Sequence, residues 1–277
     1  MKVEEPDLLR IDPDLVVPIL VEFLRNEVHR AGFTRGVLGL SGGVDSAVGF
    51  ALTVEALGAE NVIPIIMPHR ISRTRSAEDA RGLAARLGCE PEEVEITAMT
   101  DAFPDFERLD KIRAGNVMAR IRMTVLYDRS ALHKALVIGS SNKTELLLGY
   151  GTLFGDMASA VNPVGDLYKT QLRQVGEALG VPEEILSKAP SADLWEGQTD
   201  EEELGVDYAT ADAVLIRLVD RRMRPERVIE EGFDEAMVRG LLRRIRVNEY
   251  KRHLPIICKL SERTIGVDWL YPRDWGT

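Results

Sequence analysis

The stretch that decides the fold is Gly39-Leu40-Ser41-Gly42-Gly43-Val44-Asp45-Ser46-Ala47. It follows a strand-like apolar run and opens a helix-like one. Two adjacent glycines let the backbone turn sharply and bring its N–H groups near an anion, and the positive end of the following helix adds to the attraction. The stretch lacks the lysine of the GxxxxGK[ST] loop and does not match GxGxxG. We therefore expect a cradle for pyrophosphate here rather than a plain turn.

Strands and helices alternate on both sides of this loop. Apolar periodicity and glycine stops predict helices at Leu15–His29, Asp45–Leu57, Ala77–Leu87 and about Asp110–Leu132, and strands at Gly36–Leu40, Val62–Met67, Val94–Thr97 and Ala135–Gly139. This alternation is typical of an α/β fold with a doubly wound, mostly parallel sheet. Such sheets bind ligands at the carboxyl ends of their strands.

The second half of the chain has a different character. Residues 149–168 contain too many glycines for a regular element, and we interpret them as a substrate loop. Further helices are expected at about Lys169–Leu179, Tyr208–Asp220 and Asp234–Asn248, and the acidic run Thr199–Glu203 is interpreted as a solvated surface or a mobile lid. The expected organisation is a single domain over residues 1–277, with a core of about 14–190 and a C-terminal helical part and tail of about 191–277.

Composition excludes several classes of function. The 277 residues carry a formal net charge of −10, which argues against broad binding of nucleic acid or anionic membranes. Cys89 and Cys258 lie far apart with no metal-ligand spacing, so reduced thiols are expected. The acidic N-terminus has no apolar signal region, and no apolar run approaches the length of a membrane span. We expect a cytoplasmic protein.

A carboxylate inside the predicted phosphate loop needs a cation. Asp45 would repel a bound pyrophosphate group unless Mg²⁺ lay between them, and Mg²⁺ prefers a few carboxylates together with phosphate oxygens. Glu145 is the candidate for the second acid, because small polar residues again separate a buried strand from a helix in the run before it. The alternative is that Glu145 only favours the dipole of the helix it begins.

Three cations near these segments are candidates for substrate contacts. Arg120 and Arg122 lie two apart on a predicted helix, so they point to different faces and need separate partners, one an acid and the other a substrate phosphate. Lys169, judged by its own position in the sequence, is expected to be a surface lysine rather than a phosphate ligand.

The motifs, taken in order, resemble a known family. SGGVDS resembles the loop of the ATP pyrophosphatases, and GNVMARIRMTVLY, GSSNKTE, GDLYKTQL, PSADLWEGQTDEEELG and EYKRHLP together resemble ammonia-dependent NAD synthetase over nearly the whole chain. The resemblance implies the Rossmann-like fold of adenine nucleotide alpha-hydrolase type with additional C-terminal helices. It also implies a C–N ligase: ATP adenylates the nicotinate carboxylate of deamido-NAD with release of pyrophosphate, and ammonia then displaces AMP to give NAD.

The resemblance assigns roles position by position. Asp45 and Glu145 would bind Mg²⁺ and, with Lys169, form the catalytic set. Arg120, Tyr250 and Lys251 would contact deamido-NAD, although Tyr250 stands where the family has histidine. ATP would be bound by Gly39, Leu40, Ser41, Gly42, Gly43, Val44, Asp45, Ser46, Ser140, Lys169 and Ser191. Members of the family resemble homodimers with deamido-NAD at the subunit interface, and the same is expected here.

Two positions depart from the family pattern. A substrate-binding lysine and aspartate are replaced by Leu153 and Ala160. The run Gly149–Asp156 is more similar to the synthetase portion of glutamine-dependent enzymes, so the sequence leaves open whether ammonia arrives free or from a separate glutamine amidase. Two alternatives also stay open: an adenylating enzyme of the same superfamily with another acceptor, and a catalytically silent nucleotide-binding protein.

Overall fold

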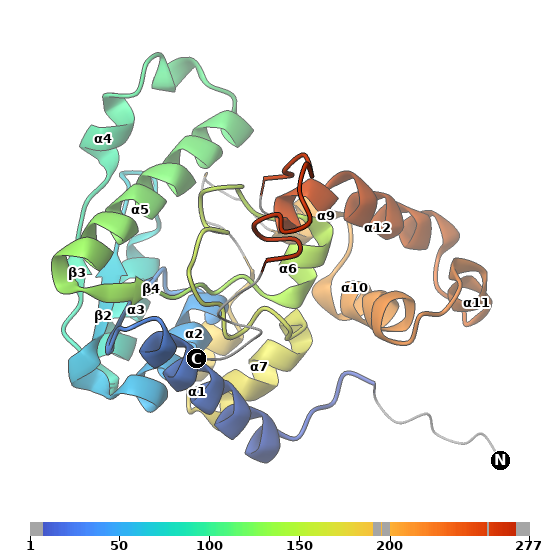
Figure 1. The fold of residues 1–277 in the computed structure, drawn as a ribbon, viewed down its shortest axis with the longest axis horizontal. Coiled ribbons are helices and arrows are strands. Elements are labelled where there is room, and N and C mark those ends of the chain that lie inside the picture. Colours follow the sequence, from blue (N-terminus) through green and yellow to red (C-terminus); the bar gives the residue numbers. More distant parts are fainter. Residues whose placement is uncertain (1–7, 191–194, 196–199, 254, 270–277) are drawn as a thin grey trace.

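A four-stranded parallel sheet forms the centre of the molecule (Figure 1). The structure, a computed structural model, describes residues 8–190, 195, 200–253 and 255–269. The strands run in the order β3-β2-β1-β4. Their bounds are β1 Arg35–Gly39, β2 Val62–Ile66, β3 Glu92–Glu93 and β4 Ala135–Val137. The predicted parallel α/β architecture is confirmed.

Each strand of the central pair divides its side chains between two apolar layers. In β1, Leu38 faces a core shared with the helices α1 (Pro13–Arg30), α2 (Val44–Leu57), α3 (Thr74–Arg86) and α7 (Lys169–Ala178). Val37, its neighbour, faces a second core shared with the long helix α5 (Lys111–His133). Burial of each such side chain contributes about 1.5–3 kcal/mol, so both faces of the sheet must be covered.

Local signals fix the ends of these helices. Asp12 caps α1 by accepting the N–H of Asp14, and Asp110 caps α5 by accepting the N–H of Arg113. Gly58 ends α2 with a φ of +82°, a conformation that glycine adopts without strain. Predicted and observed bounds agree within three residues for α1, α2, α3, α5 and α7.

The third predicted strand is displaced. We expected Val94–Thr97, but β3 is Glu92–Glu93, and Thr97 begins the short helix α4 (Thr97–Asp101). The apolar residues that suggested the strand still follow the edge of β2, because the N–H of Val94 donates to Ile66 O and that of Ile96 to Pro68 O. Pro68 has no N–H to donate in return, so the ladder of paired bonds ends at this point.

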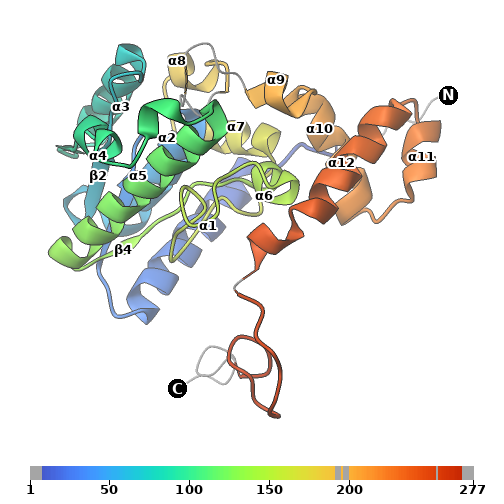
Figure 2. The ribbon, with the colours of Figure 1, turned by 90° about the horizontal axis from the view of Figure 1, so that it is seen from above.

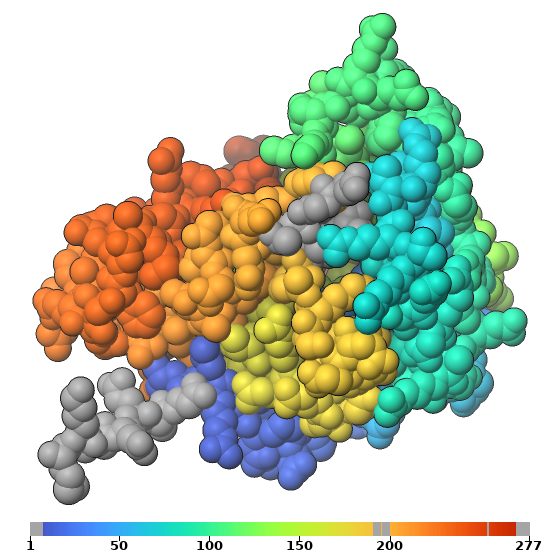
Figure 3. All heavy atoms as spheres, turned by 180° about the vertical axis from the view of Figure 1, so that it is seen from behind, coloured from blue at the N-terminus to red at the C-terminus, as the bar shows by residue number. Residues whose placement is uncertain are grey.

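A second, helical core lies beside the sheet (Figure 1). Figure 3 shows the C-terminal helices around it as an orange group of atoms at one side of the molecule. Its helices are α6 (Lys143–Leu148), α9 (Asp200–Leu204), α10 (Tyr208–Leu215), α11 (Pro225–Glu230) and α12 (Glu235–Val247). The predicted helix Tyr208–Asp220 continues beyond α10 as a π-helical turn, Ile216–Asp220. Leu148 and Tyr168 also pack into this core. The helical core is therefore in direct contact with the segments that follow β4.

The remaining elements are short. They are the α-helix α8 (Glu183–Leu186) and three 3₁₀ turns at Ala59–Asn61, Phe106–Arg108 and Glu249–Arg252. Residues 255–269 extend away from the body as a coil (Figure 2). Within the described part of the chain, no helix is long and apolar enough to cross a membrane.

Candidate active site

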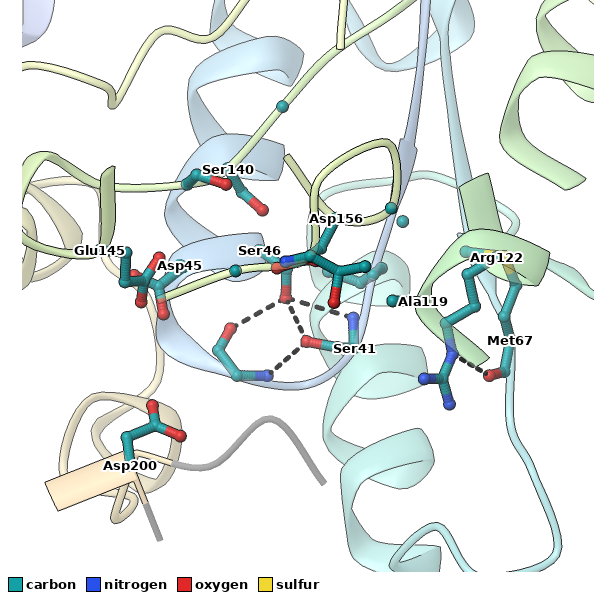
Figure 4. A pocket seen from close by; sticks show the side chains of 18 of the residues that line it. Ser41, Asp45, Ser46, Met67, Ala119, Arg122, Ser140, Glu145, Asp156 and Asp200 are labelled. Carbon is teal, nitrogen blue, oxygen red and sulfur yellow. Dashed lines mark hydrogen bonds between the residues drawn. The ribbon is translucent and has the colours of Figure 1, made fainter. Parts of the chain in front are cut away.

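The predicted phosphate loop connects β1 to α2 and borders a cavity of about 510 Å³ at the carboxyl ends of the strands. Residues 39–41 and 43–46 line this cavity. Gly43, the N-cap of α2, provides no side-chain hydrogen bond to the helix, so its first N–H groups are available to an anion. The Ser41 and Ser46 hydroxyls lie 3.0 Å apart, and Ser46 also donates to Gly43 O, which fixes the shape of the loop (Figure 4).

Gly42 has a separate role, because it does not line the cavity. Its φ is +78°, and a Cβ at this position would overlap the backbone carbonyl oxygen of Ser76 in α3. The loop therefore docks directly on the first turn of α3. Only glycine combines this backbone conformation with this close approach.

Asp45, Glu145 and Lys169 meet at one end of the cavity. Lys169 Nζ lies 2.5 Å from Asp45 Oδ2 and 3.2 Å from Glu145 Oε1, and the lysine is 1% exposed. Figure 4 shows the two carboxylates side by side. Asn142 Nδ2 donates to Asp45 Oδ1 at 2.8 Å, which connects the phosphate loop to the start of α6. The expectation that Lys169 is a surface residue is wrong, because its partners lie far away in the sequence.

Glu145 takes part in two local structures. Asn142 accepts the N–H of Glu145, and the Glu145 carboxylate accepts the N–H of Asn142, which is a capping box at the start of α6. The other carboxylate oxygen faces Lys169. The same side chain therefore begins the helix and completes the charged cluster.

The cluster holds more negative than positive charge. Burial and the nearby Asp45 carboxylate raise the pKa of Glu145 to about 8. Burial alone would lower the pKa of Lys169, but Asp45 and Glu145 outweigh it and raise the pKa. One ammonium is thus insufficient to keep both carboxylates ionised at neutral pH.

This imbalance predicts a pH-dependent stability. In the unfolded chain Glu145 loses its proton near the ordinary glutamate pKa of 4.5, whereas the folded protein holds it up to about 8. The folded state therefore binds the extra proton between these values, and the free energy of unfolding should fall as the pH rises through this window. Urea unfolding of the metal-free protein at several pH values measures the fall. Glu145→Gln, which cannot ionise, should show a smaller one, and equal slopes would contradict the assignment.

The acidic run, whose residues from Asp200 onward belong to α9, forms another wall of the cavity. Asp200 is 4% exposed and accepts hydrogen bonds from the Tyr150 and Tyr208 hydroxyls at 2.9 and 3.2 Å. Burial raises the pKa of Asp200. The expectation of a solvated surface or mobile lid is therefore wrong for Asp200, while Thr199 lies outside the described residues.

Comparisons with known proteins agree with this geometry. The family model described as NAD synthase matches residues 16–255. The chain belongs to the NAD synthase family. The NH(3)-dependent NAD(+) synthetase of Chlorobium phaeobacteroides strain BS1 is 52% identical over 268 residues, which cover 96% of this chain and 97% of that protein.

Two solved structures of similar chains carry different names. NH3-dependent NAD synthetase from Campylobacter jejuni has a TM-score of 0.76 at 34% identity and covers 90% of this chain and 100% of its own. A structure titled NMN synthetase, from Francisella tularensis, has a TM-score of 0.80 at 30% identity, covering 90% of this chain and 99% of its own. The fold and family expected from the sequence are confirmed.

The predicted site residues of this NAD synthase family member fall into two groups. Ser140 and Lys251 line the cavity together with the phosphate loop, Glu145 and Lys169. Lys251 Nζ donates to Gly149 O at 2.7 Å and Gly151 O at 2.9 Å, so it anchors the glycine-rich loop. Ser191 lies outside the described residues.

The other predicted contacts lie away from the cavity wall. The predicted site residues that are described but do not line the cavity are Gly42, Arg120, Leu153, Ala160 and Tyr250. Arg120 Nε donates to Leu153 O at 3.3 Å, so these two positions contact each other. Tyr250 is 56% exposed.

Sequence reasoning left open the role of Arg122 and did not single out two other lining residues, Asp156 and Lys188. Arg122 lines the cavity, with its Nε donating to Met67 O at 3.1 Å (Figure 4), although helical spacing alone did not show which arginine faces inward. Asp156 also lines it and accepts the N–H of Thr152 at 2.7 Å. Lys188 Nζ reaches Gly42 O at 3.2 Å, and its place just before the PSADLWEG motif was the available signal.

Proposed function

We propose that this chain is a C–N ligase that amidates deamido-NAD to NAD with ammonia, using ATP and releasing AMP and pyrophosphate. The observation that carries the proposal is the position of Lys169 Nζ between Asp45 and Glu145, beside a phosphate loop, in a chain of the NAD synthase family. The reaction expected from the sequence agrees with the names of its relatives. The reaction consumes ATP, which the cytoplasm supplies. We therefore propose the cytoplasm as the location of this protein.

The geometry fits an adenylation followed by an amidation. A carboxylate oxygen of the substrate forms a bond to the α-phosphorus of ATP, and the bond to the β,γ-pyrophosphate breaks. Ammonia then attacks the acyl carbon, AMP leaves with the original oxygen, and the nitrogen loses a proton. The loop N–H groups and Lys169 would stabilise the negative charge on the phosphates, while the cavity walls hold the reacting groups in line. We propose Asp45, Glu145 and Lys169 as the catalytic set.

We propose that Mg²⁺ completes the site, held by Asp45 and Glu145. The donor set fits a hard divalent cation, because two facing carboxylates share one ammonium and the pKa of Glu145 is raised to about 8. Across the residues that the structure describes, no group of three or more His, Cys, Asp or Glu side chains could hold a metal by itself. Phosphate oxygens of ATP would therefore supply the remaining ligands, and the metal would neutralise phosphate charge.

The substrate contacts and assembly state are also proposals. Ser140 and Ser191 would bind ATP, and Arg120 and Lys251 would contact deamido-NAD. Arg120 and Leu153 touch each other outside the cavity wall, which is compatible with a substrate that reaches beyond one subunit of a homodimer.

One other substrate is a candidate for the acceptor in place of deamido-NAD. The similar structure titled NMN synthetase raises the mononucleotide acid as an alternative acceptor, whereas the relative with 52% identity is named for NAD. Purified protein with ATP and Mg²⁺ should be given either deamido-NAD or nicotinic acid mononucleotide, each with ammonium or glutamine. We expect NAD and pyrophosphate in equal amounts from deamido-NAD and ammonium. A preference for the mononucleotide would assign the other acceptor. Absence of ATP cleavage with every acceptor would indicate a catalytically silent nucleotide-binding protein.

A further inference from the structure

Asp212 connects the two helix starts that carry the catalytic side chains. It lies on α10 in the helical part and is fully buried. One carboxylate oxygen accepts the Thr144 hydroxyl at 2.5 Å, and the other accepts the N–H of Thr170 at 2.9 Å. The Thr144 hydroxyl in turn accepts the N–H of Lys169 at 3.1 Å. One network of hydrogen bonds therefore joins α10, α6 and α7.

The positions of these partners matter for the charged cluster. Thr144 immediately precedes Glu145, and Thr170 immediately follows Lys169. The Glu145 and Lys169 side chains meet 3.2 Å apart, although they come from different helices. One backbone bond also joins these segments, because the N–H of Lys143 donates to Leu167 O at 2.8 Å. Asp212 adds bonds from a third helix to both helix starts, and so helps to set the geometry between them.

A second carboxylate acts on the same two helix starts. Asp220 accepts the Tyr168 hydroxyl at 2.7 Å and Lys143 Nζ at 2.8 Å. Asp220 follows Asp212 by eight residues, which in an α-helix would place it about 80° round the axis. The intervening π-helical turn, Ile216–Asp220, winds each residue through a smaller angle and returns Asp220 towards the face of Asp212.

We infer that Asp212 and Asp220 form a carboxylate clamp, through which the C-terminal helical part positions Glu145 and Lys169. Neither aspartate lines the cavity, so both are positioning residues and not catalytic ones. The inference deepens the proposed function and rests on it. It gives the helical part a role in the chemistry, because the clamp connects that part to the helix starts that carry Glu145 and Lys169.

Thr144→Val tests the clamp, because valine matches the shape of threonine and lacks the hydroxyl that joins Asp212 to Lys169. Pyrophosphate release by this variant should have a kcat at least about tenfold below wild type, since small misplacements of reacting groups are costly. Thr144→Ser keeps the hydroxyl and should stay within about threefold of wild type. Asp212→Asn should reproduce the loss, and combining it with Thr144→Val should add little, because both remove one connection.

Thr53→Val is the matched control. Thr53 is also fully buried, and its hydroxyl donates to Gly49 O at 2.6 Å within α2, away from the clamp. Its variant should keep the wild-type kcat even where its melting temperature falls as far as that of Thr144→Val. Equal kcat values for Thr144→Val and Thr144→Ser, or an equal loss in Thr53→Val, would overturn the clamp. Absence of NAD formation by wild type would instead overturn the proposed function, before any variant is compared.

Discussion

Lys169→Met is expected to lower the rate of pyrophosphate release by about 100- to 1,000-fold, the range for loss of one preorganised group that stabilises charge. The substitution also leaves Asp45 and Glu145 facing each other with no ammonium between them. Breaking a buried ion pair in this way costs about 3–5 kcal/mol of stability. Because the pKa of Glu145 is raised to about 8, part of this cost is avoided by protonation at low pH. The stability lost in the variant should therefore grow as the pH rises.

Chemical denaturation across the pH range and a steady-state assay check both parts of this prediction. Lys259→Met is the control, since Lys259 Nζ also pairs with a carboxylate, Asp268 Oδ1 at 2.7 Å, but is half-exposed. Water screens that pair, so its loss should change neither stability nor turnover appreciably. Wild-type activity in Lys169→Met would mean that the buried ammonium only balances charge and takes no part in the reaction.

Gly42→Ala should damage the phosphate loop more than any other single methyl group added to it. The new Cβ would overlap the Ser76 carbonyl, and the φ of +78° is unfavourable for alanine. Strain of this kind costs about 1–3 kcal/mol, and relieving it would move the loop away from α3. A displaced loop no longer directs its N–H groups at the phosphates, so kcat/KM for ATP should fall about 100-fold.

Gly43→Ala is the comparison variant, because Gly43 is the N-cap of α2 and faces the cavity, whereas Gly42 packs against α3. A Cβ at Gly43 meets only Ser41 Oγ, at 3.4 Å, and the residue has a φ of −93°. The fold should therefore tolerate Gly43→Ala, with a melting temperature near that of wild type. If the melting temperature of Gly42→Ala were no lower than that of Gly43→Ala, the packing of Gly42 against α3 would not be what fixes the conformation of the phosphate loop.

Local sequence patterns predicted the parts of this site that depend on neighbouring residues. The loop before α2 and the start of α6 at Glu145 follow from glycine pairs, small polar residues and apolar periodicity. Each signal lies within a few residues of the element it forms. Such patterns determine the local backbone conformation. The phosphate loop and the capping residue Glu145 could therefore be placed from the sequence alone.

The rest of the site depends on residues that are far apart in the sequence. Lys169 is buried because Asp45, 124 positions earlier, faces it, and no pattern around the lysine shows this. Asp200 is buried because Tyr150 and Tyr208 donate to it, although its own neighbourhood is an acidic run. Helical spacing separated Arg120 from Arg122 but could not show which side of α5 packs beside the cavity.

Transfer of an oxygen atom from substrate to AMP is the most direct test of the account. Deamido-NAD labelled with ¹⁸O in its nicotinate carboxylate should be converted with ATP, Mg²⁺ and ammonium, and the products analysed by mass spectrometry. If the carboxylate attacks the α-phosphorus beside Asp45, Glu145 and Lys169, AMP gains one ¹⁸O per NAD formed and pyrophosphate gains none. Label in pyrophosphate or phosphate, or unlabelled AMP alongside labelled NAD, would contradict adenylation of this carboxylate at this site.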